Sequence, residues 1–364
     1  MIISSLPARS ISVNGRFLAQ PVTGVQRYAH ELLSALDFLR RSGALEEIPI
    51  TILVPPGAKN LPSWTSFRIQ QAGRFSGQLW EQIDLPVHAR GSLLFTPCGG
   101  APVVYPYHVI TIHDAGPFST PHAYTASYGT YYRWLQRILS RRALHILTVS
   151  DFSRTELIRT LKVPETRITR TWLSGEHILR CGKDDTILGR NKLIRGRYVL
   201  AVSSRNPNKN VEGLARAFQS LGLSDVTLVV AGGSNASVFG QSRSSFSGAR
   251  ETGTVTDPEL RSLYENAGCF VFPSFYEGFG LPPLEALTIG CPVVVSRAAS
   301  LPEVFGDAVT YCDPHSPNDI ARQISRVMNG EHPDRGVALR HASRFTWEQC
   351  ARETWSVLLN AMDH

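Results

Sequence analysis

The chain carries its most informative pattern in residues 272–287, which run Phe-Pro-Ser-Phe-Tyr-Glu-Gly-Phe-Gly-Leu-Pro-Pro-Leu-Glu-Ala-Leu. Seven residues separate Glu277 from Glu285, and Gly278 and Gly280 lie between them. The glycines predict a loop with accessible backbone amides, and the two adjacent prolines predict that a helix begins directly after it. One carboxylate is therefore expected on a loop and the other on a first helical turn, where the helix N-terminus favours anions.

This arrangement suits a ligand that carries both hydroxyl groups and phosphate, as a sugar nucleotide does. The carboxylates of Glu277 and Glu285 would accept from the hydroxyls, and the amides of residues 278–281, including those of Phe279 and Leu281, would assist. A pair of carboxylates is also what a glycoside hydrolase uses as its acid and base. That alternative is less natural here, because a glycine loop that opens a helix is an anion site.

Short apolar runs alternate with helical patterns on both sides of this segment, which predicts parallel α/β layers. The chain is therefore expected to be an α/β protein with two Rossmann-like domains that face each other across a cleft, residues 1–176 and 177–344, joined by the polar segment 177–197. Ligands of such sheets bind at the carboxyl ends of the strands. The predicted strands are residues 50–54, 93–96, 109–112, 146–149, 198–202, 227–231, 269–272 and 292–295.

Three further motifs follow the ends of strands or begin a helix. Arg205 and Lys209 come after the strand at 198–202, where two cations can hold a diphosphate. His113 follows the strand at 109–112 together with Asp114, at the expected mouth of the cleft. Gly24 opens a helix whose first turn has the Thr-x-x-Gln spacing of a capping box and suits a phosphate, although this pattern alone more often marks an ordinary capped core helix.

Composition bounds the class of protein. The length of 364 residues predicts about two domains, and 43% hydrophobic and 18% charged residues are ordinary for a soluble globular enzyme. No apolar run approaches the roughly 18–20 residues that span a bilayer. The first residues lack the pattern of a signal peptide, and the six cysteines form no Cys-x-x-Cys pair. We therefore expect a cytoplasmic protein with reduced thiols.

The net charge of +7 is distributed unevenly. Residues 1–176 hold 18 Lys and Arg against 11 Asp and Glu, whereas residues 177–364 hold 19 of each. The first half is thus expected to meet a phosphate, an acidic lipid surface or an acidic glycan, or simply to present a solvated basic surface. No basic run interleaved with aromatics indicates a nucleic acid as partner.

Taken together, the motifs resemble those of the retaining glycosyltransferases of the GT-B fold in glycosyltransferase family 4. The resemblance rests on Arg-x-x-x-Lys after a strand, on Glu-Gly-Phe-Gly-Leu-Pro-Pro-Leu-Glu, and on Asp257-Pro-Glu-Leu-x-x-Leu-Tyr-x-x-Ala, in this order. In the first half, Leu79-Trp-Glu-Gln, Thr111-Ile-His-Asp and Val149-Ser-Asp-Phe-Ser resemble the bacterial mannosyltransferases that build cell-surface polysaccharides such as lipopolysaccharide.

The resemblance implies a role for each matching residue. Arg205 and Lys209 would neutralise the diphosphate of a nucleoside diphosphate sugar, Glu285 would hold the ribose, and Glu277 and His113 would contact the transferred hexose. Gly24 would approach the diphosphate from the other domain. The nucleobase would lie beside Gly253, Thr254 and Val255. Both Lys209 and Glu285 are expected to face the cleft, and a helix over about 345–364 is expected to pack back on the first domain.

The same resemblance implies a hexose, with GDP-mannose as the favoured donor, passed to a glycan or a lipid-linked saccharide with retention of configuration. The acceptor hydroxyl would attack from the face from which the diphosphate leaves, so that catalysis is mostly positioning and charge stabilisation. No metal or other cofactor is implied. The alternatives are a sugar-nucleotide epimerase of the same fold and a non-catalytic scaffold, whereas a nicotinamide dehydrogenase would need a Gly-x-Gly-x-x-Gly that the chain lacks.

Residues 131–142 offer one explanation for the excess positive charge of the first half. Arg133, Arg137 and Arg141 are spaced by four and share one face of a predicted helix, beside Tyr131, Tyr132 and Trp134. Such a face predicts weak attachment to an anionic membrane. An ordinary surface helix with solvated arginines is the alternative.

Overall fold

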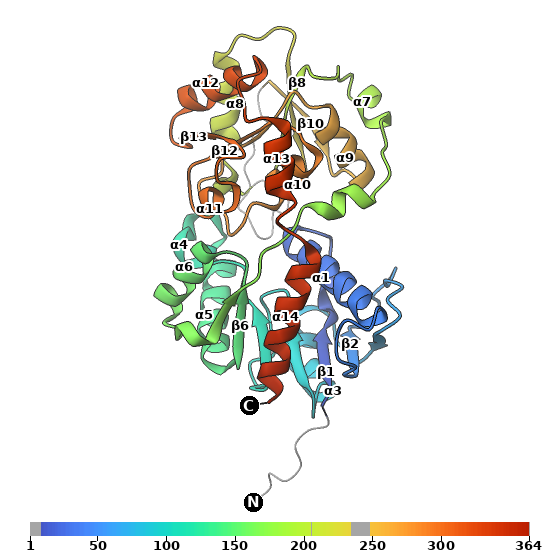
Figure 1. Cartoon of the computed structure of the whole chain (residues 1–364). Coiled ribbons are helices and arrows are strands. Elements are labelled where there is room, and N and C mark those ends of the chain that lie inside the picture. The colour runs from blue at the N-terminus through green and yellow to red at the C-terminus, as the bar shows by residue number, and fades with distance from the viewer. Residues whose placement is uncertain (1–8, 205, 234–247, 364) are drawn as a thin grey trace, which may run out of the picture.

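The computed structural model describes residues 9–204, 206–233 and 248–363, which form two lobes (Figure 1). Within these ranges the lower lobe holds seven parallel strands in the order β3-β2-β1-β4-β5-β6-β7. Their bounds are β1 Ile11–Asn14, β2 Ile50–Val54, β3 Arg68–Gln71, β4 Leu93–Thr96, β5 His108–Thr111, β6 His145–Thr148 and β7 Ile168–Arg170. Parallel strands need helical crossovers, and these cover both faces of the sheet.

The upper lobe repeats the arrangement with six described parallel strands in the order β10-β9-β8-β11-β12-β13. Their bounds are β8 Tyr198–Val202, β9 Thr227–Ala231, β10 Ala249–Gly253, β11 Cys269–Phe272, β12 Val293–Ser296 and β13 Thr310–Cys312. The chain therefore has the α/β architecture of two Rossmann-like domains that the sequence predicts.

The eight predicted strands are all present, and none is displaced by more than one residue at either end. The sequence patterns missed β1, β3, β7, β10 and β13. Four of these lie at or near the edges of the sheets, where burial is incomplete and the apolar signal is weak. The fifth, β1, is central and fully buried, but its Ile-Ser-Val-Asn sequence is short and half polar.

Helices connect the strands in both lobes. Those of the first lobe are α1 Gly24–Arg41, α2 Gly77–Leu79, α3 Leu85–His88, α4 Gly116–Ser119, α5 Ala126–Arg142 and α6 Asp151–Leu161. Those that follow are α7 Thr186–Arg190, α8 Val211–Ser220, α9 Asp257–Asn266, α10 Leu281–Ile289, α11 Leu301–Phe305, α12 Pro317–Met328, α13 Arg335–Ala342 and α14 Trp347–Met362. No helix in the described ranges has the length and apolarity needed to cross a bilayer.

The last helix returns to the first lobe. Figure 1 shows α14 beside α1, and α14 also contacts β4 and β6. Its Trp347 and Trp355 are almost fully buried there. We propose that residues 1–176 and 177–344 are the two domains and that the C-terminal helix belongs with the first.

The segment between the lobes is more ordered than a polar linker. Residues Glu176–Arg180 form the 3-10 helix η5, which packs on α10 and α9, and α7 packs on α9. His177 and Ile178 of η5 are buried. The polarity of this segment reflects side chains that are paired inside the protein as well as side chains in solvent.

Candidate active site

The loop that follows β11 in the upper lobe meets the loops that follow β5 and β6 in the lower lobe. The carbonyl oxygen of Gly278 accepts hydrogen bonds from the hydroxyls of Ser150 (2.6 Å) and Ser153 (3.1 Å). A Cβ on Gly278 would lie 3.0 Å from the carbonyl oxygen of His113 and 3.1 Å from the Cβ of Asp114. The absence of a side chain at this position therefore lets the two lobes touch.

Lys209 and Glu277 form an ion pair at this junction. The distance from Lys209 Nζ to Glu277 Oε1 is 2.7 Å, and the side chains are 21% and 13% exposed. Lys209 Nζ also lies 4.8 Å from the centre of the Phe272 ring. Partial burial weakens screening by solvent, so the ammonium is a stronger local charge here than on an open surface.

Backbone and side-chain contacts hold this pair in place. Lys209 ends the 3-10 helix η6 (Pro207–Lys209), and the side-chain amide of Asn210 donates to the carbonyl oxygens of Pro273 (3.1 Å) and Pro314 (2.7 Å). Asn210 stands at the start of α8, but its side chain does not cap that helix. It ties the loop of Lys209 to the loop of Glu277. Arg205, the second predicted cation, lies outside the described residues.

Glu285 differs from the expectation that it faces the cleft, because only 6% of the residue is exposed. Its Oε2 accepts from the hydroxyl of Tyr264 (2.8 Å), and its Oε1 lies 2.9 Å from Nε2 of His177. Trp347 Nε1 donates to Nδ1 of the same histidine (3.4 Å), which places the ring proton on Nε2, toward the carboxylate. A carboxylate in an apolar helix needs such donors, since an unpaired buried charge is costly.

Sequence reasoning missed His177 and Tyr264 as partners of Glu285. Tyr264 belongs to the Asp257–Ala267 segment that carries the family resemblance, and its place in that pattern was the available signal. His177 falls in the segment taken as a linker, where no spacing relates it to Glu285. Long-range packing alone brings these two side chains together.

His113 lies directly beyond β5, as predicted. Its Nε2 donates to the carbonyl oxygen of Pro97 (3.1 Å), and its ring packs edge to face with the ring of Tyr28, with the ring centres 4.8 Å apart. Burial lowers the pKa of His113 to about 4, so the ring is neutral at pH 7. Nδ1 is then the acceptor nitrogen, which suits a hydrogen bond from a sugar hydroxyl.

Asp114, which the sequence places with His113 at the mouth of the cleft but without a role of its own, is a further carboxylate at the junction. Its Oδ1 accepts from the backbone N–H of Gly116 (2.7 Å). Burial raises the pKa of Asp114, the carboxylate of Glu277 raises it further, and Lys209 opposes the shift. Asp114, Glu277 and Lys209 thus form one electrostatic unit that spans both lobes.

Phe279 and Leu281 are buried where the Glu277 loop enters α10, whereas Gly24 and residues 253–255 lie around a second contact between the lobes. Gly24 begins α1, a Cβ added there would meet nothing within 4 Å, and the predicted capping box is present. Three residues on, Arg27 pairs with Asp257 of α9 at 2.5 Å. Residues 253–255, Gly-Thr-Val, directly precede α9 and its cap. The structure therefore brings Gly24 and Gly253–Val255 to the same side of the molecule.

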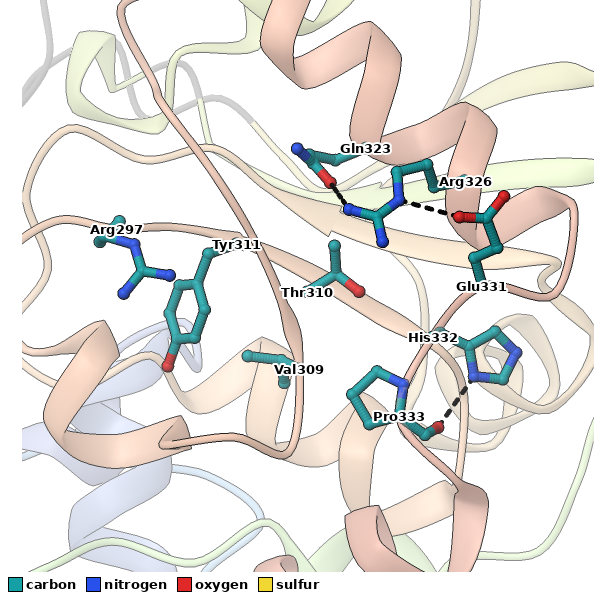
Figure 2. Close-up of a pocket in the computed structure, with 9 residues that line it drawn as sticks. All are labelled: Arg297, Val309, Thr310, Tyr311, Gln323, Arg326, Glu331, His332 and Pro333. Carbon is teal, nitrogen blue, oxygen red and sulfur yellow. Dashed lines mark hydrogen bonds and ion pairs between the residues drawn. The ribbon is translucent and has the colours of Figure 1, made fainter.

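The remaining features concern metal binding and other cavities in the structure. No cluster of three or more metal-ligating His, Cys, Asp or Glu side chains occurs among the residues that the structure describes. An open hollow of about 700 Å³ lies between β13, α12 and the segment before α13 (Figure 2). None of its lining residues is a predicted site residue, and its Arg326 is engaged by Gln323 and Glu331.

Family models match both halves of the chain. Residues 22–171 match the model "Glycosyltransferase Family 4", and residues 189–344 match "Glycosyl transferases group 1". Among curated proteins, O-antigen chain mannosyltransferase B of Escherichia coli is 37% identical over 263 residues, which cover 68% of each protein. O-antigen chain mannosyltransferase RfbU of Salmonella typhimurium is 29% identical over 329 residues, or 86% of this chain and 90% of that protein.

Solved structures share the two-lobed fold. Anabaena Alr3699/HepE in complex with UDP-glucose superposes with a TM-score of 0.71 at 14% identity, covering 97% of this chain and 99% of that one. Sucrose-phosphate synthase from Thermosynechococcus elongatus has a TM-score of 0.68 at 18% identity, covering 97% and 98%. At these identities the likeness concerns the GT-B fold alone.

Proposed function

Because this chain belongs to glycosyltransferase family 4, we propose that it is a mannosyltransferase that extends a saccharide in the synthesis of a surface polysaccharide. One observation carries the proposal furthest: Gly278, next to the Lys209–Glu277 ion pair of the upper lobe, lies against His113 and Asp114 of the lower lobe. Groups suited to a phosphate thus meet groups suited to sugar hydroxyls at one point. The mannosyltransferase names of the similar Escherichia coli and Salmonella proteins support mannose as the transferred sugar.

GDP-mannose is the proposed donor, with a UDP-hexose as the alternative. Lys209, with Arg205, would stabilise the diphosphate, and Glu277 would accept from hydroxyls of the mannose. Glu285 would position the ribose from its place between His177 and Tyr264. The amides of residues 278–281 and the open backbone at Gly24 and at residues 253–255 would contact the phosphates and the base.

We propose that transfer retains the anomeric configuration. The acceptor oxygen would form a bond to the anomeric carbon from the side on which the bond to the diphosphate breaks, and the leaving phosphate oxygen would take the acceptor proton. His113 would accept a hydrogen bond from a hydroxyl through its neutral Nδ1, and Lys209 would offset the charge that develops on the phosphate. The barrier is then lowered by orientation and electrostatics.

We propose that the reaction needs no metal, because Lys209 and Arg205 supply positive charge where a divalent cation would otherwise act. Transfer is expected to continue in excess EDTA. A complete loss of transfer that magnesium or manganese restores would contradict this part of the proposal.

We propose further that the enzyme acts in the cytoplasm and attaches weakly to anionic membrane through α5. Arg141 and Trp134 are exposed there, but Arg133 donates to the carbonyl oxygen of Pro117 and Arg137 lies 5.0 Å from the ring centre of Phe118. Two of the three arginines therefore have neighbours in the protein, and the attachment should be weak. Co-sedimentation with acidic but not neutral vesicles, lost on replacing all three arginines by Gln, is the expected result.

The function itself is tested by incubating the purified chain with labelled GDP-mannose and α-linked mannose oligosaccharides. The expected result is a lengthened oligosaccharide with the new linkage in the α configuration by NMR. Release of an epimerised sugar nucleotide without any acceptor would point to the epimerase alternative. Binding of GDP without any turnover would point to a scaffold.

A further inference from the structure

Helix α5 carries a stripe of side chains that is buried in its second half and partly open in its first. Tyr128, Tyr132, Leu135 and Leu139 are spaced by four, three and four residues, so they lie on one face. Leu135 and Leu139 are 1% and 0% exposed, whereas both tyrosines are only partly buried. The inward face of α5 is therefore buried near the end of the helix and partly accessible near its start.

Three tyrosine rings are stacked along this accessible part. The rings of Tyr124 and Tyr128 are 5.6 Å apart and inclined by 5°, and those of Tyr128 and Tyr132 are 4.3 Å apart and inclined by 28°. We call these three residues the tyrosine ladder. Each ring combines an apolar surface with a polar tip, so a row of them suits a ligand that has both kinds of surface.

One end of the tyrosine ladder lies at the candidate active site. The hydroxyl of Tyr124 and Oδ1 of Asp114 both lie within 3 Å of where a side chain on Gly116 would begin. Burial raises the pKa of Tyr124, and the next largest cause is the carboxylate of Asp114. Since Asp114 faces the Gly278 loop, the ladder begins where the two lobes meet.

The other end lies against a buried polar cluster. Burial acts to lower the pKa of Arg16, but Glu81 and Tyr132 outweigh it and raise the value. Arg16 pairs with Glu81 (3.3 Å), and Asn14 donates to the same carboxylate (2.7 Å). Glu81 is 1% exposed and lies in η2 (Trp80–Asp84), a π-helical turn of the kind that is frequent at functional sites.

We propose that the tyrosine ladder binds the acceptor saccharide, a deepening that rests on the proposed function. Because the faces of the stacked rings cover one another, two successive sugars would lie across the open edges of Tyr128 and Tyr132, and the hydroxyl that attacks would lie at Asp114. The cluster of Arg16, Asn14 and Glu81 is buried and would hold Tyr132 in place without contacting the sugar. A saccharide fits better than a lipid, because both ends of the ladder are charged.

The ladder is also distinct from the face proposed to attach to membrane. Arg133, Arg137 and Arg141 follow their own four-residue spacing on another side of α5. Trp134, which is 52% exposed, lies near those arginines on the helix and offers a matched aromatic control. A flat bilayer on that side would not reach the inward-facing tyrosines.

The test compares Tyr128→Leu, Tyr132→Leu, Tyr132→Phe and Trp134→Leu with the unaltered chain. The probes are α-linked mannotriose and α-methyl mannoside, with GDP-mannose as donor. We expect each Leu variant on the ladder to raise the KM for mannotriose by about tenfold and to raise the KM for α-methyl mannoside less, because the longer ligand loses more contacts with the tyrosine rings. Tyr132→Phe keeps the ring and should restore most of the affinity.

Two direct measurements accompany the kinetics. Saturation-transfer NMR should show mannotriose binding that the two Leu variants weaken and that Trp134→Leu leaves intact. The Kd for GDP, measured by calorimetry, should change by less than about twofold, as expected for a change confined to the acceptor side. Thermal unfolding identifies any variant that does not fold. If Tyr128→Leu or Tyr132→Leu fails to fold, the other of these two variants tests the proposal.

The proposal is overturned if folded Leu variants bind mannotriose as the unaltered chain does, or if GDP binding falls in parallel. It is also overturned if they lose binding to acidic vesicles while mannotriose binding stays intact, since the ladder would then face lipid. Failure of the proposed function appears differently, as no transfer by the unaltered chain. In that event, mannotriose binding that depends on Tyr128 still supports saccharide binding by the tyrosine ladder. If the unaltered chain does not bind mannotriose at all, the proposal is overturned.

Discussion

Lys209 gives the sharpest test at the scale of single residues. Replacing it by Met removes the ammonium 2.7 Å from Glu277, and we expect turnover to fall by about 10²–10³-fold because charge on the leaving phosphate is no longer offset. The measurement is kcat with saturating GDP-mannose. Lys192→Met is the matched control, since Lys192 is exposed and is not at the junction of the lobes. Turnover close to normal in Lys209→Met would refute the assignment.

His108 and His113 make stability depend on pH. Burial lowers the pKa of each to about 4, whereas an unfolded histidine titrates near 6.5. Between these values the unfolded chain binds more protons, so stability is complete above about pH 6.5 and falls as the pH drops toward 4. Urea unfolding at pH 7.5 and pH 5 should show this loss.

The variant that isolates this effect is His108→Asn combined with His113→Gln. These amides preserve donors at the positions of His108 Nδ1 and His113 Nε2, which bond to Tyr105 and Pro97. The double variant should lose less stability than the unaltered chain between the two pH values. An equal loss would mean that other groups account for the pH dependence.

At the scale of elements, the loop between β11 and α10 determines how closely the lobes approach. Gly278→Ala would place a methyl group 3.0 Å from the carbonyl oxygen of His113, and that atom belongs to the other lobe. We expect the fold to survive, while kcat falls more than GDP affinity does, because the two halves of the site are held apart. Steady-state kinetics and GDP calorimetry separate the two effects.

Gly182→Ala is the control for this experiment, because an added Cβ there meets nothing within 4 Å. It should match the unaltered chain in both kcat and GDP affinity. If Gly278→Ala also matches it, then contact between these two loops does not govern the reaction.

At the scale of the whole molecule, Glu303 links the lobes through a helix end. Its carboxylate accepts from the backbone N–H groups of Asp151 and Phe152 at 2.8 Å each, at the first turn of α6. Free N–H groups at a helix start favour a carboxylate, and here it comes from α11 of the other lobe. Asn208 adds a bond to Thr120 across the same junction (2.8 Å).

We expect Glu303→Ala to loosen the arrangement of the lobes. Solution scattering without nucleotide should give a larger radius of gyration for this variant than for the unaltered chain, and GDP should reduce the difference. Glu348→Ala, which removes an exposed carboxylate on α14, is the control. Superimposable curves for all three proteins would show that Glu303 does not hold the lobes together.

Local patterns in the sequence were sufficient for much of this picture. Strands such as Ile50–Val54 and Cys269–Phe272 were predictable because burial on both sides of a parallel sheet demands a continuous apolar run. A sugar-nucleotide site was predictable from the spacing of Glu277 and Glu285, the glycines between them, and the position of Lys209 after β8. These features are local, because a loop, a helix cap and a helix start are each specified by neighbouring residues.

Only the tertiary structure decided which distant residues meet. His177 and Glu285 are 108 positions apart, and nothing in the sequence around either relates one to the other. The same holds for Glu303 and the start of α6, and for Tyr132 beside Arg16. The periodicity of apolar residues in the sequence reveals which face of a helix or strand is apolar. The partner of a buried polar group depends instead on how the two sheets and α14 pack. These long-range contacts arise from close packing of the whole chain, which no local window of sequence contains.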